Sequence, residues 1–378
     1  MPSGGRDDAL AAALAPSPAT DGRPEARPAP DHLAGEPVLE LDRLCVRYQR
    51  GPTATLQAVS NVSLSLDRGD VLGIVGESGS GKSTLARAIL RLLPRNTRLS
   101  GEIRLGGRDL LSCSEREIRR IRWAQVSMVF QDAMNALNPV LRVRDQLVET
   151  IRQHEDMPRR AAARRAAELV EMVGLDERTL QRHPHELSGG MRQRVCIAMA
   201  FACNPRLVLA DEPTTALDVI TQDRVIAEML ELQRSRDQTM IFISHDIALV
   251  SEVSHKVGVM YAGHLVEFGR VGEILFESGH PYTMGLLNAF PRADVDHDVV
   301  SIPGDPARFE EIPDFCPFID RCPFSQPVCA ERVPEPRQIA PGHWAACHFA
   351  DDAEQLRARA KDPLTWRPTV PAEPEAAT

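Results

Sequence analysis

Gly76-Glu77-Ser78-Gly79-Ser80-Gly81-Lys82-Ser83 decides the fold of this chain, because it has the spacing of a phosphate-binding loop, G-x-x-x-x-G-K-S. The apolar run Val71–Val75 precedes it and predicts a buried strand. A helical pattern from Leu85 to Leu92 follows, and Pro94 predicts its end. A strand, a glycine-rich turn and a helix start together point several backbone N–H groups at one anion.

The residue types in this loop suit a triphosphate and its metal ion. A lysine at the position of Lys82 reaches the β- and γ-phosphates, and the hydroxyl of Ser83 can hold Mg²⁺. The alternative is a chance glycine–serine turn, but the flanking strand and helix that the motif requires are both predicted. The candidate residues for binding ATP and Mg²⁺ in this stretch are Gly76, Ser78, Gly79, Ser80, Gly81, Lys82, Ser83 and Thr84.

Length and composition limit the class of protein. The 378 residues predict one to three domains, and the formal net charge of -9 argues against a nucleic-acid partner. No apolar run approaches the roughly 18 residues of a membrane span. Asp7 and Asp8 precede the first apolar run, where a secretory signal carries positive charge. We therefore expect a cytosolic protein whose eight cysteines are reduced thiols or metal ligands.

The first part of the chain predicts a flexible arm followed by strands. Residues 1–37 are rich in proline and alanine and predict a disordered arm. Alternating apolar residues predict half-buried strands at 44–48 and 62–66, and glycines at both ends of 101–107 predict a hairpin. Tyr48 either packs within its strand or stacks on a nucleotide base.

A change of periodicity then predicts a helical region. Residues 125–130 predict a short strand that ends at Gln131, and from about 143 to 199 the apolar pattern is mostly helical, with one stripe ending at Gly174. The arginines of 159–165 predict a solvated helix face rather than a binding site.

Ser188, Gly189 and Gly190 begin a further helix. Ser188 is positioned to cap it. Two interpretations stay open from the local residues: an ordinary helix start, or a second anion site at a helix N-terminus.

Two later strands end in chemically informative side chains. Residues 207–210 predict a buried strand followed by Asp211 and Glu212, and 239–244 predict another that ends at His245. Strand ends beside a phosphate loop are where ligands gather in open α/β sheets. Asp211 suits Mg²⁺ and Glu212 suits a general base for water. His245 is either structural or a contact to the γ-phosphate, and residues 256–260 and 264–268 predict a hairpin.

In this order, the motifs make the chain resemble an ATP-binding-cassette (ABC) ATPase over about residues 38–350. The resemblance rests on Tyr48 as the adenine-stacking aromatic, the loop 76–83, the Q-loop Gln131, the signature Leu187-Ser188-Gly189-Gly190-Met191, Asp211-Glu212, the D-loop Ala216-Leu217-Asp218 and the switch His245. Met191 stands where many members have glutamine. The resemblance implies an α/β P-loop NTPase fold with an antiparallel β-subdomain, a helical subdomain and a small C-terminal cysteine-containing extension.

The expected domain organisation follows from this resemblance. We expect a disordered arm at 1–37, an ABC ATPase domain at 38–290 with its helical subdomain at about 133–203, a peptide-importer-type extension with a four-cysteine site at 291–350, and a tail at 351–378.

Within the family, the chain most resembles the ATPases of oligopeptide and dipeptide importers. The similar stretches are Phe130-Gln131-Asp132-Ala133-Met134-Asn135-Ala136-Leu137-Asn138-Pro139, the LSGGMRQRV of 187–195, His280-Pro281-Tyr282-Thr283, and Ile302-Pro303-Gly304 leading to the Cys-Pro pairs. Some similar proteins carry nickel, oligosaccharides or other small solutes. Peptide is therefore the expected cargo, with nickel or oligosaccharide as alternatives.

The resemblance also implies partners. Such ATPases work as head-to-tail pairs, in which Ser188, Gly189 and Gly190 act on the ATP held by the partner's loop. Glu212, Gln131 and His245 are then the catalytic set. The expected partners are a second, homologous ATPase chain, two transmembrane permease subunits and a solute-binding protein. The segment 133–150 would dock on the permeases, at the cytoplasmic face of the cell membrane.

Four cysteines near the C-terminus predict a metal site. Cys316, Cys322, Cys329 and Cys347 have the spacing C-x5-C-x6-C-x17-C, whereas structural zinc usually has closer pairs. Iron–sulfur clusters accept wider spacing, so a [4Fe–4S] cluster is favoured over zinc, free thiols or a disulfide. Similar peptide-importer ATPases often carry this cysteine set.

Two histidines near these cysteines, His343 and His348, are alternative ligands, although neutral surface histidines are expected. The other four cysteines, Cys45, Cys113, Cys196 and Cys203, fall in core-like segments and predict small hydrophobic residues.

The competing functions are a soluble ABC ATPase that acts on DNA or ribosomes and a GTP switch. The first class usually has two cassettes, coiled-coil insertions or basic surfaces, and the chain shows one cassette and net negative charge. A GTP switch lacks support because the sequence has no Asn-Lys-x-Asp run to recognise the guanine base.

Overall fold

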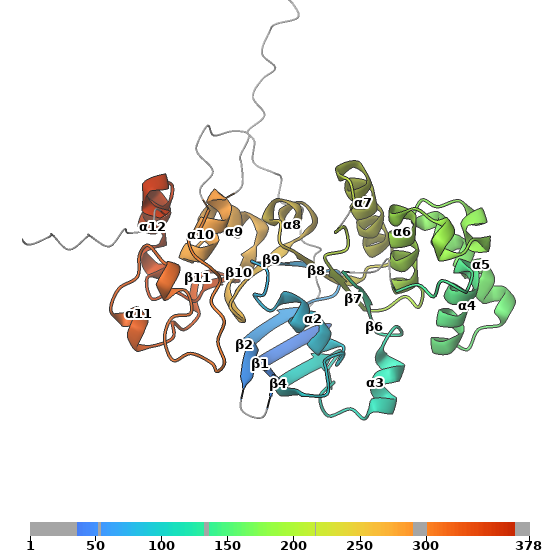
Figure 1. Cartoon of the computed structure of the whole chain (residues 1–378), viewed down its shortest axis with the longest axis horizontal. Helices are drawn as coiled ribbons and strands as arrows, with labels where there is room; N and C mark the ends of the chain where they lie inside the picture. Colours follow the sequence, from blue (N-terminus) through green and yellow to red (C-terminus); the bar gives the residue numbers. More distant parts are fainter. Residues whose placement is uncertain (1–35, 52–53, 132–135, 216, 290–300, 367–378) are drawn as a thin grey trace, which may run out of the picture.

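The computed structural model describes residues 36–51, 54–131, 136–215, 217–289 and 301–366. Within them the chain forms one four-stranded and one eight-stranded sheet, and helix α2 (Lys82–Ile89) lies between the two (Figure 1). Most of the predicted arm at 1–37 lies outside the described residues, as do 290–300 and 367–378.

The larger sheet carries the phosphate loop. Its strand order is β11-β12-β10-β9-β3-β8-β7-β6, and β6, β7, β8, β3 and β9 run parallel. The bounds are β3 Val71–Val75, β6 Val126–Val129, β7 Leu207–Asp211, β8 Thr239–Ser244, β9 Lys256–Tyr261, β10 His264–Arg270, β11 Arg337–Ala340 and β12 His343–Ala345. Residues of β3, β6, β7 and β8 are buried throughout, as expected for parallel strands covered on both faces. The predicted strands and the hairpin of β9 and β10 are confirmed.

Successive residues of β3 divide between two hydrophobic cores, because side chains alternate across a strand. Leu72 and Ile74 pack in the core that contains α2 and the smaller sheet. Val71 and Val75 pack in the core beneath the helices on the opposite face. Those helices are α7 Val219–Ser235, α8 Ile247–Val253, α9 Val271–Glu277 and α10 Pro281–Asn288 (Figure 1).

The smaller sheet is antiparallel, with the order β2-β1-β4-β5. Its strands are β1 Leu39–Gln49, β2 Thr55–Leu66, β4 Thr97–Leu105 and β5 Arg108–Asp109. The predicted strands at 44–48 and 62–66 are confirmed within β1 and β2. The predicted hairpin at 101–107 is centred differently, since Gly101 lies inside β4. The turn falls at Gly106 and Gly107, whose φ angles of 53° and 76° favour glycine.

Helix α2 ends at Ile89, one turn before the end predicted from Pro94. Arg91 has a left-handed backbone (φ 52°) and its guanidinium donates to the carbonyl oxygens of Leu110 and Cys113. This contact with the connection leading to α3 (Glu115–Ile121) stabilises the end of the helix, so the proline is not what stops it.

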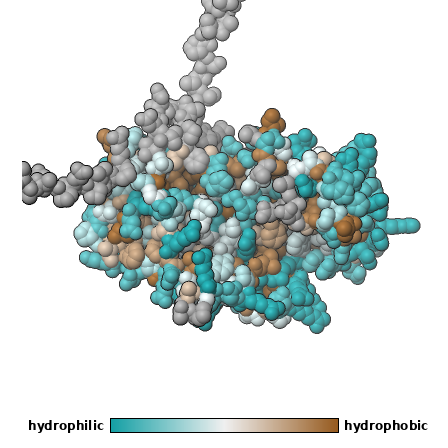
Figure 2. All heavy atoms as spheres, viewed as in Figure 1, coloured by the Kyte–Doolittle hydropathy of each residue, from teal (hydrophilic) through white to brown (hydrophobic). Residues whose placement is uncertain are grey.

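A helical subdomain extends from the sheet beyond β6. It contains α4 Val143–His154, α5 Arg159–Met172 and α6 Gly189–Ala200, with short 3-10 turns at Glu177–Gln181 and Pro184–Glu186. Gly174 follows α5 with φ 64°, as predicted. The expected solvated arginine face holds for α5, whose Arg159 side chain is 71% exposed, while Arg165 pairs with Glu155 at 2.6 Å. Figure 2 shows a largely hydrophilic face at this end of the molecule.

The C-terminal extension packs against the opposite end of the larger sheet. Strand β12 pairs antiparallel with β10, and α11 (Val328–Glu331) lies at the same end of the molecule (Figure 1). The segment predicted as a tail from residue 351 contains a helix among the described residues. Helix α12 (Ala353–Ala360) packs against α10, and the buried Leu356, Ala360 and Trp366 supply the apolar contacts that hold it. No helix in the described part of the chain is long and apolar enough to cross a lipid bilayer.

Candidate functional site

The phosphate loop joins the end of β3 to α2, and its backbone requires glycine at two positions. Gly76 has φ 156° and Gly81 has φ 102°, which L side chains rarely adopt. A Cβ at Gly76 would lie 2.1 Å from the carbonyl oxygen of Met260, and one at Gly81 would lie 2.3 Å from that of Ala58. The loop therefore fits between β9 and β2 only with glycine at both positions.

Lys82 begins α2 and points back across the loop. Its Nζ donates to the carbonyl oxygens of Gly76 at 2.7 Å and Glu77 at 2.9 Å. Burial lowers the pKa of Lys82, whereas the nearby carboxylates of Glu212 and Asp211 raise it. A buried ammonium held by two carbonyl oxygens can exchange them for the more strongly accepting oxygens of a phosphate.

Ser83 and Asp211 lie together behind the loop. The Ser83 hydroxyl donates to Oδ1 of Asp211 at 2.8 Å, and burial raises the pKa of Asp211. The other carboxylate oxygen, Oδ2, is buried and has no hydrogen-bond partner among the described residues. A hydroxyl and a carboxylate with unused lone pairs match the oxygen donors that Mg²⁺ prefers. These residues therefore fit the predicted metal ion.

A cavity of about 360 Å³ opens over the loop. The predicted residues that line it are Tyr48, Ser78, Gly79, Gly81, Lys82, Ser83, Thr84, Gln131 and Glu212. The Tyr48 hydroxyl lies 3.2 Å from Oγ1 of Thr84, so the aromatic ring stands at the wall of this cavity. Gly76, Ser80 and Asp211 are not among its lining residues.

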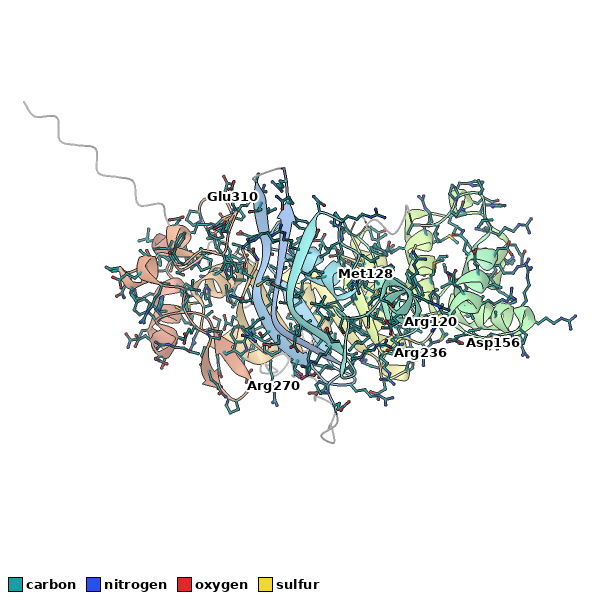
Figure 3. All side chains as sticks on the ribbon, turned by 90° about the horizontal axis from the view of Figure 1, so that it is seen from below. Arg120, Met128, Asp156, Arg236, Arg270 and Glu310 are labelled. Carbon is teal, nitrogen blue, oxygen red and sulfur yellow. The ribbon has the colours of Figure 1, made fainter. Side chains whose placement is uncertain are left out.

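Residues 307–309 of the extension line the same cavity, although no sequence pattern predicts them there. They run along the edge of β2. The backbone N–H of Gln57 donates to the carbonyl oxygen of Phe309 at 2.9 Å, and Oγ1 of Thr55 donates to that of Glu310 at 2.8 Å. Figure 3 labels Glu310 beside the end of the blue strands. No motif marks this segment, because the contact joins residues 255 positions apart.

Glu212, Gln131 and His245 meet at the carboxyl edge of the larger sheet. Nε2 of Gln131 donates to Oε2 of Glu212 at 3.0 Å, and Nδ1 of His245 lies 3.4 Å from its Oε1. The three residues follow β6, β7 and β8, which are neighbouring parallel strands, so their ends lie side by side. Glu212 has φ 46°, an uncommon backbone conformation of the kind that clusters at functional sites.

Thr215 is a further member of this cluster that sequence reasoning did not identify. Its Oγ1 donates to Oε2 of Glu212 at 3.1 Å, the same oxygen that accepts from Gln131. Its position three residues after the carboxylate was the available signal, since a hydroxyl in the following turn can reach back to it.

Ser188 caps α6 as predicted, accepting from the backbone N–H of Met191 at 3.3 Å. A second cavity of about 410 Å³ is lined by Ser188, Gly189, Gly190, Met191, Arg194, Leu217, Asp218 and Thr221. None of these residues lines the cavity over the phosphate loop, and no residue of that loop lines the second cavity. Of the predicted D-loop, Ala216 lies outside the described residues. One chain thus keeps the loop and the signature apart.

All four predicted cysteines of the extension are free thiols, of which Cys316, Cys329 and Cys347 are buried and Cys322 is half-buried. The N–H of Cys316 donates to the carbonyl oxygen of Cys329 at 2.8 Å. Burial raises the pKa of Cys322, and the neighbouring Cys347, Cys316 and Cys329 raise it further. Burial also raises the pKa of Cys316 to about 11 and that of Cys347 to about 12.

The geometry of these thiols does not amount to a ligand set in the structure. Across the described residues, no group of three or more His, Cys, Asp or Glu side chains is arranged to hold a metal ion. The disulfide alternative is likewise not adopted, since all eight cysteines are free.

The prediction of surface histidines is wrong for His343. The side chain is fully buried, and its Nε2 lies 2.9 Å from Oε1 of Glu267, which is also buried. That carboxylate accepts in addition from the N–H groups of Gly279 and His280. The histidine is buried because β12 joins the sheet beside β10, a pairing that no local pattern shows. His348 is half-buried and contacts the carbonyl oxygen of Arg332 at 3.0 Å.

Comparison with known proteins agrees with these features. The family model described as ABC transporter matches residues 59–215, and the model described as Oligopeptide/dipeptide transporter, C-terminal region, matches residues 266–329. A dimeric post-hydrolysis structure of the ATP-binding cassette MJ0796, bound to ADP and Pi, matches with a TM-score of 0.56 and 28% identity, covering 62% of this chain and 98% of that one. The chain is thus an ABC-type ATPase cassette.

Curated relatives narrow the class further. The oligopeptide transport ATP-binding protein OppD of Salmonella typhimurium is 41% identical over 313 residues, covering 82% of this chain and 93% of that protein. The dipeptide transport ATP-binding protein DppD of Escherichia coli is 42% identical over 322 residues, covering 84% and 98%. The chain belongs to the ATP-binding proteins of the oligopeptide/dipeptide ABC transporter family.

Proposed function

We propose that this protein is the ATP-hydrolysing subunit of an ABC importer for dipeptides and oligopeptides. The observation that carries the cargo class is the match of residues 266–329 to the C-terminal region of oligopeptide/dipeptide transporters, because this match is separate from that of residues 59–215 to the general ABC transporter model. The ATPase activity is supported by the loop and the carboxylate cluster, which flank one cavity.

ATP would lie in the cavity over the phosphate loop. Tyr48 would stack on the adenine, Lys82 would bind the β- and γ-phosphates, and Ser83 and Asp211 would hold Mg²⁺. When bound, Mg²⁺ neutralises charge on the phosphate oxygens. Glu212 would accept a proton from the attacking water, while Gln131 and His245, which contact its two carboxylate oxygens, orient it.

The separation of the two cavities supports a head-to-tail pair of ATPases. The signature at Ser188–Gly190 opens on a cavity of its own, so it needs a nucleotide held by another subunit. A structural neighbour, the ATP-binding cassette MJ0796, is dimeric in its structure bound to ADP and Pi. The second ATPase would be a homologous chain, with two permease subunits and a solute-binding protein completing the importer at the cytoplasmic face of the membrane.

Membrane recruitment tests this proposal. When the protein is expressed together with the permease genes encoded beside it, it is expected in the membrane fraction, and in the supernatant when expressed alone. Lys82→Ala should still sediment with the membranes, because the substitution leaves the expected docking segment 133–150 unchanged. Retention in the supernatant with the permeases present would reject the importer and favour a soluble ATPase acting on DNA or ribosomes.

We also propose that Cys316, Cys322, Cys329 and Cys347 hold a [4Fe–4S] cluster. Support comes from the donor chemistry, because four neighbouring thiols, three of them buried, suit iron–sulfur ligation. The described geometry lacks a closed ligand set, so the proposal requires the thiols to move together on binding.

Iron analysis after anaerobic purification tests the cluster. We expect about four iron and four sulfide per chain. Cys316→Ser should reduce both, whereas Cys45→Ser in β1 is the matched control and should leave both unchanged. Colourless protein without iron or labile sulfide would rule out the cluster.

A further inference from the structure

An arginine of the C-terminal extension reaches the phosphate loop. Nη1 and Nη2 of Arg321 donate to Oε2 and Oε1 of Glu77, at 2.8 and 3.0 Å, so the two side chains form a two-pronged ion pair. The Arg321 side chain is 6% exposed and that of Glu77 is 25% exposed. Arginine–carboxylate pairs of this geometry fix both position and orientation.

Arg321 is itself held rigidly by its surroundings. Its Nε donates to the carbonyl oxygen of Pro303 at 2.8 Å, and its guanidinium lies 5.7 Å from the ring centroid of Tyr261. Phe318, three residues earlier, packs against Tyr261 and Tyr282 with centroids 5.1 and 5.4 Å apart. The extension and the ATPase core therefore share one aromatic cluster directly beneath the loop.

Glu77 connects the backbone of the phosphate loop to the C-terminal extension. Its N–H donates to the hydroxyl of Tyr282 at 2.9 Å, and its carbonyl oxygen accepts from Lys82 at 2.9 Å. A bound phosphate would compete for the Lys82 contact, because Lys82 is the residue expected to bind the phosphates. The contacts to Tyr282 and Arg321 are then what keep this residue in place.

The charge of Glu77 makes a partner necessary. A carboxylate within a loop that binds a polyanion repels it. Burial lowers the pKa of Lys82, and the charge of Glu77 opposes this lowering after the larger effects of Glu212 and Asp211. Arg321 pairs with this carboxylate from the side of the extension. The net charge that Glu77 and Arg321 together present to the phosphates is close to zero.

We propose that Arg321 is a positioning residue for ATP binding: it neutralises and orients Glu77, so the C-terminal extension completes the phosphate-binding loop. This inference rests on the proposed ATP site. By reciprocity of linked equilibria, ATP binding and docking of the extension stabilise each other.

A double-mutant cycle tests the proposal, with the Kd for ATP measured at equilibrium on the full-length chain. Arg321→Gln leaves Glu77 unpaired beside the phosphates and is expected to raise the Kd for ATP about tenfold. Glu77→Gln leaves the positive charge of Arg321 unpaired near the phosphates and should give a Kd no higher than that of the unmodified protein. The double variant should return to within about twofold of that protein, since no net charge is left at the pair.

Three further measurements distinguish an effect of the Arg321–Glu77 pair on ATP binding from a general loss of structure in the extension. Arg321→Lys retains the charge and should recover most of the affinity. Arg337→Gln breaks a pair with Asp351 in the same extension and should leave the Kd unchanged. The buried Cys316, Cys329 and Cys347 should stay unreactive to thiol reagents in each variant, which shows that the extension is still docked.

Opposite results would overturn the inference. An unchanged Kd in Arg321→Gln, or a double variant as weak as that single variant, would reduce the pair to a structural contact. If the unmodified protein does not bind ATP, the proposed function fails instead.

Discussion

Glu212→Gln is expected to retain ATP binding and to slow hydrolysis by about 10²–10⁴, the contribution of a general base. Glutamine keeps the size of the side chain and can still contact Gln131 and Thr215, but it cannot accept a proton from water. The ATP-bound state should therefore accumulate. Single-turnover hydrolysis and equilibrium ATP binding, measured on the same preparation, separate the two effects.

Glu252→Gln is the matched control, because it makes the same change at an exposed position in α8. Its turnover should equal that of the unmodified protein. Full turnover by Glu212→Gln would remove this carboxylate from the role of base, and the neighbouring His245 would be the next residue to test.

Lys82→Ala is expected to weaken ATP binding by about 10- to 100-fold, the range for losing one charge-assisted hydrogen bond. The substitution also frees the carbonyl oxygens of Gly76 and Glu77, which the ammonium holds in the structure. Both effects act on the loop that would cradle the phosphates. Calorimetric titration with ATP and Mg²⁺ measures the change.

Lys361→Ala provides the control, since this lysine is exposed at the end of α12. Its Kd should match that of the unmodified protein. An equal Kd for Lys82→Ala would argue that the loop does not bind the triphosphate.

Local patterns in the sequence predicted most of the fold. The strand, loop and helix of 71–89 and the strand ends at Asp211 and His245 are all local features, because apolar periodicity and glycine spacing act within a few residues. Errors arose where a distant contact decides the outcome. Helix α2 ends through Arg91 and not Pro94, and α12 forms where a tail was expected, because α10 offers it an apolar surface.

The sequence by itself determined which chemical groups the protein has and which strand ends carry them. Tertiary structure alone decided which groups meet. Thr215 joins Glu212, His343 is buried against Glu267, and Arg321 reaches Glu77 across 244 positions of the chain. The physical reason is that side-chain pairing and charge neutralisation act through space, whereas a sequence motif records only neighbours along the chain.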